Sequence, residues 1–171
     1  AYLYGKTVTL ANTHWPETNA LMLKNRRIGL SQTGVIQAFN KFGRRTMYQW
    51  SDNAYEHVKQ LDEEYSDWLC IPRSVRTTSI KPSGTVSLLN GSTPGIHFPE
   101  DEYYIRRIRF AKDSQLIEPL REAGYKIEID SYSPNTLCVE FPVKEPHFVK
   151  GKRDVSMWEQ LEIAAQYQHY W

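Results

Sequence analysis

The chain has 171 residues, of which 40% are hydrophobic and 24% charged, proportions typical of a globular domain. Its net charge of +1 gives no strong field to attract a nucleic-acid polymer, and no apolar run is long enough for a membrane span. Two cysteines are too few for a disulfide framework, and no signal-peptide pattern opens the sequence, so we expect a reducing, cytoplasmic setting.

Helical periodicity and one buried apolar run organise the first half of the chain. They predict helices over residues 1–10, 16–24, 35–42 and 51–69, and a short buried strand over 26–31. Pro16 suits the first turn of a helix. Gly43 and Pro72 are expected to end the third and fourth helices.

The fourth helix is predicted to be the longest, with two contrasting faces. An apolar stripe is formed by Ala54, Val58, Leu61, Tyr65 and Trp68. Three successive acidic residues, Asp62, Glu63 and Glu64, are expected on its solvated face. No histidine or carboxylate faces these three at ligand spacing, so the sequence predicts no metal site there.

Strands and helices mostly alternate in the second half, which favours an α/β fold. Strands are expected over residues 77–80, 103–110, 125–129 and 136–141, and helices over 86–89 and 114–123. Residues 142–154 are rich in proline and lysine and are expected to form a surface loop. Ser156 and Glu159 form a capping box that begins a last helix.

Residues 77–91 carry the main local signal of function. They run from a strand through a tight turn to the start of a helix. The free N–H groups and the dipole at a helix start attract anions. Ser83 is a good N-cap, and Gly84 lets a ligand approach the backbone closely. The charge of Lys81 and the hydroxyl of Thr85 add to this attraction.

This pattern predicts a phosphate-binding loop. Its binding residues are expected to be Ser83, Gly84, Thr85 and Val86. The alternative is that Ser83 only caps a helix in an ordinary loop, because short Gly/Ser motifs recur by chance. The spacing of a Walker loop is absent.

Two further groups of residues allow a functional and a structural interpretation. Strand alternation puts Arg107 and Arg109 on one face, where they could clamp a phosphate or a carboxylate. Structural ion pairs with a neighbouring element are the favoured interpretation. His97 follows the predicted phosphate loop and could face a nucleotide or a cofactor, or be an ordinary loop histidine.

The cysteines and the remaining histidines show no catalytic or metal-binding pattern. Cys138 lies in an alternating strand and is expected to be a small buried hydrophobe. Neither Cys138 nor Cys70 belongs to a Cys-x-x-Cys pair, so neither has the signature of a redox site. The other histidines lack the mutual spacing of zinc ligands.

Several motifs occur in the order found in a known family. They are Asn25–Ser31, Ile80–Val86 with Gly91–Phe98, Tyr104–Phe110 and Cys138–Pro142. Together they resemble ribonucleotide reductases, above all the adenosylcobalamin-dependent (class II) ribonucleoside-triphosphate reductases. The resemblance covers about residues 25–171, and several motifs in order are far more specific than any one of them.

The resemblance implies an α/β fold that is a partial segment of the ten-stranded α/β barrel of ribonucleotide reductases and pyruvate formate-lyase-like enzymes. Residues 1–171 are then expected to be a single piece of the catalytic barrel, with no internal domain boundary. Both ends look cut, because the sequence starts at Ala1 and stops at Trp171 inside a helical pattern. We expect the remainder of the barrel to be its partner.

The family removes the ribose 2′-hydroxyl by cysteine-radical chemistry. The resemblance therefore implies a ribonucleotide substrate, adenosylcobalamin as the cofactor of the full-length enzyme and thioredoxin as its reductant. The family's radical cysteine lies in a Cys-x-Glu finger loop. Cys70 is followed by Ile71 and Pro72, and Cys138-Val139-Glu140 resembles a strand of the family, not that loop. We expect the catalytic cysteines outside this chain.

What remains for this chain is the substrate-phosphate side of the barrel. The resemblance assigns the phosphate to the loop from Ser83 to Val86, with Lys81 and His97 near the nucleotide or cofactor. Two alternatives stay open. The chain could be a free-standing nucleotide- or phosphate-binding module without catalysis, or part of another reductase class of the same barrel superfamily.

Overall fold

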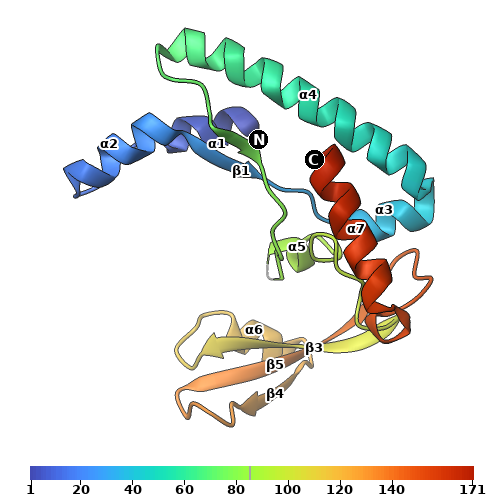
Figure 1. Ribbon diagram of the computed structural model, residues 1–171. Helices are drawn as coiled ribbons and strands as arrows, with labels where there is room; N and C mark the ends of the chain where they lie inside the picture. Colours follow the sequence, from blue (N-terminus) through green and yellow to red (C-terminus); the bar gives the residue numbers. More distant parts are fainter. Residues whose placement is uncertain (85) are drawn as a thin grey trace.

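The computed structural model describes residues 1–84 and 86–171 (Figure 1). The helices are α1 (Tyr2–Val8), α2 (Pro16–Asn25), α3 (Val35–Phe42), α4 (Arg44–Leu69), α5 (Val86–Leu89), α6 (Ile117–Glu122), the 3-10 helix η1 (Lys152–Asp154) and α7 (Met157–Tyr170). The strands are β1 (Arg27–Leu30), β2 (Arg76–Thr78), β3 (Tyr103–Ala111), β4 (Lys126–Ile129) and β5 (Thr136–Lys144). Within these residues no helix is both long and apolar enough to cross a membrane.

A parallel strand pair with a helical crossover forms the first region. β1 and β2 pair in parallel, with Arg27 opposite Arg76 and Leu30 opposite Thr78. The chain between them runs through α3 and the 26-residue α4, because parallel strands need a long connection. The buried core where α1, β1 and α4 meet is formed by Tyr2, Ile28 and Val58.

An antiparallel sheet forms the second region. Its strand order is β3-β5-β4, and α6 lies against one face (Figure 1). Burial along β3 alternates residue by residue, so every second side chain turns toward α6. The core beneath α6 is formed by Ile117, Leu137 and Val139.

A third cluster joins these two regions. It brings together α3, α7 and the segment that follows α5. Its buried members are Val35, Ile36, Phe39, Ile96, Phe98, Ile163 and Tyr167. Figure 1 shows α7 packed beside α3, with α4 on one side and the antiparallel sheet on the other.

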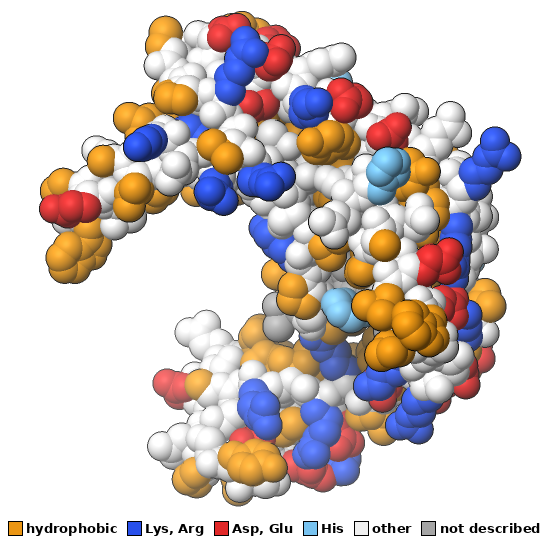
Figure 2. Space-filling model, in the orientation of Figure 1, with side chains coloured by type: hydrophobic (Ala, Val, Ile, Leu, Met, Phe, Trp, Pro, Cys, Tyr) orange, Lys and Arg blue, Asp and Glu red, His pale blue; other side chains and the backbone are white. Residues whose placement is uncertain are grey.

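The three parts together give a molecule shaped like a C. Figure 2 shows the hollow of the C between an arm that carries α2 and the arm formed by the antiparallel sheet. The short helix α5 lies on the inner side of this curve (Figure 1). The predicted phosphate loop leads into this helix.

The longest helix differs from its prediction at its start and on its faces. α4 begins at Arg44 rather than residue 51, because Gly43, with φ 85° and ψ 149°, is the single break between α3 and α4. The apolar stripe holds at Val58, but Trp68 is 69% exposed. Asp62, expected in solvent, is buried.

β5 and the loop after it also differ. β5 extends to Lys144 through Pro142, which lies opposite Ile105 of β3. β4 pairs only with residues 137–140 of β5, so Pro142 lies where no second strand needs its missing N–H. The following loop is not wholly on the surface, because Glu145 is buried within it.

Helix α6 is shorter than predicted. It starts at Ile117 rather than Ser114, because the first residues form a turn in which the Ile117 N–H donates to the Ser114 carbonyl, 3.1 Å away. The final helix agrees with its prediction at the N-terminus. The hydroxyl of Ser156 caps α7 by accepting from the Glu159 N–H.

Candidate phosphate site and its surroundings

The central loop, residues 79–97, contains the predicted phosphate site and is tied to the first region at both ends. At its start, the Ser79 N–H donates to the Leu30 carbonyl at 2.9 Å. Near its end, the Thr93 carbonyl accepts from the Gly34 N–H at 2.8 Å. The loop therefore leaves β2 and returns to the N-terminus of α3.

The two ends of the central loop touch each other at Gly95. Its φ of +52° lies in the left-handed region, and a Cβ there would come within 2.4 Å of the Lys81 carbonyl oxygen. A second close approach occurs where a Cβ on Gly29 would lie 2.9 Å from the Ser79 Oγ. These contacts close the loop and hold the segment that carries His97 against Lys81.

The turn itself is exposed on one side. Gly84 has no atom within 4 Å of the position a Cβ would take, and the Val86 side chain is 64% exposed. On the other side, the Ser83 carbonyl accepts from the N–H of Ser87, 3.3 Å away, and from its buried hydroxyl. A ligand can approach the turn from the Gly84 side.

The structure corrects one detail of the predicted site and leaves another outside its range. Ser83 has φ +49°, and α5 begins only at Val86, so Ser83 does not directly precede the helix as a cap would. That position belongs to Thr85, which lies outside the described residues. Its predicted part in phosphate binding stays a prediction.

Lys81 and His97, the predicted neighbours of the nucleotide, are both exposed. The Nδ1 of His97 lies 3.1 Å from the Pro94 carbonyl, and the His97 N–H donates to the same oxygen at 2.9 Å. This arrangement is that of a loop histidine in a turn. The Nε2 edge of the ring is free of that contact.

The predicted arginine pair forms structural ion pairs, as favoured from the sequence. Arg107 contacts Glu128 at 2.8 Å, and Arg109 contacts Asp130 at 2.9 Å. The Arg109 hydrogen bond lowers the pKa of the Asp130 carboxyl below its ordinary value. These arginines bind carboxylates on the exposed face of the antiparallel sheet, so they are not free to clamp a phosphate.

The burial of Cys138 agrees with its prediction. Cys138 is buried in β5, whereas Cys70 is exposed at the end of α4. No group of three or more histidine, cysteine, aspartate or glutamate side chains is placed to hold a metal ion among residues 1–84 and 86–171.

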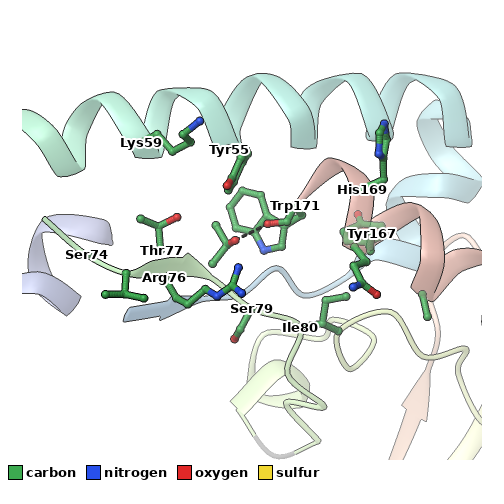
Figure 3. Close-up of a pocket in the computed structure, with 14 residues that line it drawn as sticks. Tyr55, Lys59, Ser74, Arg76, Thr77, Ser79, Ile80, Tyr167, His169 and Trp171 are labelled. Carbon is green, nitrogen blue, oxygen red and sulfur yellow. Dashed lines mark hydrogen bonds between the residues drawn. The ribbon is translucent and has the colours of Figure 1, made fainter. Parts of the chain in front are cut away.

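Sequence analysis did not reveal a hollow of about 650 Å³ beside β2 (Figure 3). Tyr55 and Lys59 reach into it from α4, Arg76 comes from β2, and His169 and Trp171 come from the last turn of α7 and its end. The volume is within the range of small-molecule sites. Neither Ser83, Gly84 nor Val86 lines it, so it is distinct from the predicted phosphate turn.

A buried ionic cluster was also missed. The side chain of Lys6 is fully buried and forms an ion pair with Asp62. Asp62 also accepts from the Ser74 N–H at 2.8 Å and from the hydroxyls of Ser74 and Tyr2. Burial alone raises the pKa of Asp62, but the hydrogen bonds from Lys6, Ser74 and Tyr2 hold it at about 2.

This cluster joins α1, α4 and the segment that leads into β2, so its role is to fix the strand pair beneath the central loop. The residues of this cluster are far apart in the sequence, so no local sequence pattern predicts that they meet.

The fold and the loop define a segment of an α/β barrel of the ribonucleotide reductase type. The chain superposes over its full length, with a TM-score of 0.83 and 33% identity, on 28% of the solved structure of a B12-dependent (class II) ribonucleotide reductase. The expected fold class is thereby confirmed. No protein-family model matches the chain.

Curated relatives identify the family more closely. The chain is 49% identical over all its residues to a probable adenosylcobalamin-dependent ribonucleoside-triphosphate reductase of Dictyostelium discoideum, and 48% identical to the enzyme of that name from Euglena gracilis. It spans about a quarter of their length, 23% and 24% respectively. The chain is thus homologous, from end to end, to one segment of the class II ribonucleotide reductases.

Proposed function

We propose that this chain acts as part of a ribonucleotide reductase that converts ribonucleoside triphosphates to 2′-deoxyribonucleotides by cysteine-radical chemistry. The observation that carries the proposal is the 49% identity over the entire chain, with no unmatched region. The full-chain superposition on a class II enzyme supports it independently. The catalytic and reducing cysteines would lie in other parts of the barrel.

The contribution of this segment would be to hold the substrate phosphates at Ser83, Gly84, Thr85 and Val86. The open side of Gly84 supports this role, because a phosphate oxygen needs close access to backbone N–H groups. The exposed ammonium group of Lys81 can supply charge. A fixed phosphate sets the position of the ribose, and errors of an ångström there lower the rate strongly.

The complete enzyme would use adenosylcobalamin, which supplies the radical when bound, and thioredoxin as reductant, in the cytoplasm. We expect the remainder of the barrel to contribute to the site of that cofactor.

A segment exchange tests this function. Residues 1–171 replace the matching segment of the Euglena gracilis reductase, and adenosylcobalamin-dependent formation of deoxynucleotide is measured. We expect the exchange enzyme to be active, because nearly half of the residues are already shared. A folded exchange enzyme that binds nucleotide without turnover would instead favour a phosphate-binding module without catalysis.

A further inference from the structure

One face of α3 gathers two chain segments that are distant in sequence. The Gln37 Nε2 donates to the Gly91 carbonyl at 2.9 Å and also to a carboxylate oxygen of Glu145. One turn further on, the Asn40 Nδ2 donates to the His147 carbonyl at 2.9 Å. Of these two side chains, Gln37 is the one that contacts both the central loop and the segment after β5.

Glu145 is an unusual partner because its side chain is buried, with only 4% of the residue exposed. Its backbone is fixed as well, since the Glu145 N–H donates to the Glu102 carbonyl at 2.8 Å. Burial raises the pKa of this carboxyl, and the hydrogen bond from Gln37 opposes that rise. Burying a carboxyl group is costly unless hydrogen bonds compensate, and among the described residues Gln37 supplies the side-chain hydrogen bond to Glu145.

The hydrogen-bonding chemistry of Gln37 and Glu145 indicates what their contact does. A carboxylate only accepts hydrogen bonds, so Glu145 requires the NH2 end of the Gln37 amide to face it. The second N–H of the same nitrogen is then directed at the Gly91 carbonyl. Without Glu145 the amide could turn over and present its oxygen to that carbonyl, which would repel it.

Gly91 lies two residues after the end of α5 at Leu89, where the central loop turns back toward α3. The Thr93 carbonyl, two residues further on, accepts from the Gly34 N–H. The side-chain amide oxygen of Gln37 lies close to Gly34, where an added Cβ would be 3.1 Å from that oxygen. The exit of the loop is therefore held at two points by the first turn of α3.

We propose that Gln37 and Glu145 are positioning residues: the buried carboxylate orients the Gln37 amide, the amide holds Gly91, and the held exit fixes the turn from Ser83 to Val86. The substrate part of this inference rests on the proposed function, because it takes that turn as the phosphate site. Neither residue needs to touch the nucleotide.

The test uses the exchange enzyme described above and two readouts. Hydrogen exchange of the central-loop amides reports how firmly the loop is held. The KM and kcat for a ribonucleoside triphosphate report whether the loop contributes to substrate binding and turnover. We expect Gln37→Ala to speed exchange about tenfold and to raise KM about tenfold, with a smaller effect on kcat, because it removes the hydrogen bond to Gly91 and the part-buried, charge-linked hydrogen bond to Glu145.

The variants of Glu145 separate orientation from mere packing. Glu145→Ala should match Gln37→Ala, and the double variant should be no worse than either, because both remove one linked contact. Glu145→Gln keeps an accepting oxygen in the same volume and should lie between these variants and the unaltered enzyme. It also keeps the test valid if Glu145→Ala does not fold.

Asn40→Ala is the matched control. It removes the contact of α3 with His147 and leaves Gln37 and Gly91 in place, so both readouts should change less than twofold. Unchanged loop exchange in Gln37→Ala would overturn the inference. Faster exchange with an unaltered KM would support the role of Gln37 in holding the loop. It would instead refute Ser83 to Val86 as the phosphate site.

Discussion

Lys6 and Asp62, 56 residues apart in the sequence, form an ion pair inside the protein. Lys6 also donates to the Ser66 hydroxyl at 2.7 Å, so its charge is bound by more than one oxygen. The pair links α1 to the middle of α4, above the β1–β2 pair. A charged pair with so little exposure is sensitive to the loss of either partner.

Asp62→Asn should therefore weaken the contact of α1 with α4. The substitution keeps the shape but leaves the Lys6 ammonium buried without its counter-charge, which costs about 3–5 kcal/mol. The free energy of local opening, measured by native-state hydrogen exchange of α1 amides, should fall by that order. As control, Glu63→Gln removes an exposed carboxylate paired with Arg73 and should cost less than about 1 kcal/mol.

The same carboxyl predicts how stability depends on pH. The pKa of Asp62 is about 2 in the folded protein, below its ordinary value of 3.8, so its stabilisation is fully present above pH 4 to 5. It is lost as the pH falls through the folded pKa, and the total is about 2 kcal/mol. Protection of α1 amides that does not decline between pH 5 and pH 2 would contradict this.

Two glycines of the central loop should respond to alanine in opposite ways. Gly95→Ala is expected to distort the loop, because φ is +52° and the new Cβ would meet the Lys81 carbonyl. Gly84→Ala meets nothing within 4 Å, so the loop should keep its structure. Its methyl group would instead crowd a bound phosphate and raise the KM for nucleotide several-fold.

Loop hydrogen exchange and KM, measured on both glycine variants, check this contrast. A Gly84→Ala enzyme with unaltered loop exchange and unaltered KM would show that no ligand approaches the turn from its open side.

Arg109→Ala should have little effect on either stability or substrate binding. The Arg109 side chain is 63% exposed where it pairs with Asp130, and ion pairs of exposed side chains add little to stability because solvent screens them. The KM for nucleotide should stay within twofold of the unaltered value. A tenfold rise in KM would instead indicate that Arg109 binds the substrate phosphate.

Local sequence signals were sufficient to predict features that depend on residues close together in the sequence. Gly43 ends α3 as predicted, and Ser156 starts α7. Alternation along β3 correctly placed Arg107 and Arg109 on one exposed face. These features depend on backbone freedom, capping and side-chain period, which neighbouring residues reveal.

Features that depend on distant partners were not predictable in this way. Asp62 looked solvated because Lys6 lies in another helix, and Glu145 looked like part of a surface loop because Gln37 is 108 residues away. Pro142 looked like the end of a strand, since the sequence does not show that β4 stops short of it. The proposed function was inferred from several family motifs in order, which composition and periodicity do not contain.

The central claim is that the turn from Ser83 to Val86 binds the substrate phosphates. The most direct measurement is the affinity of the exchange enzyme for a ribonucleoside triphosphate and for the same nucleoside without phosphate, with and without Ser83→Ala and Thr85→Ala. We expect each substitution to weaken triphosphate binding about tenfold, as loss of a hydrogen bond to a charged group does, and to leave nucleoside binding unchanged. Equal losses for both ligands, or no loss for either, would contradict the claim.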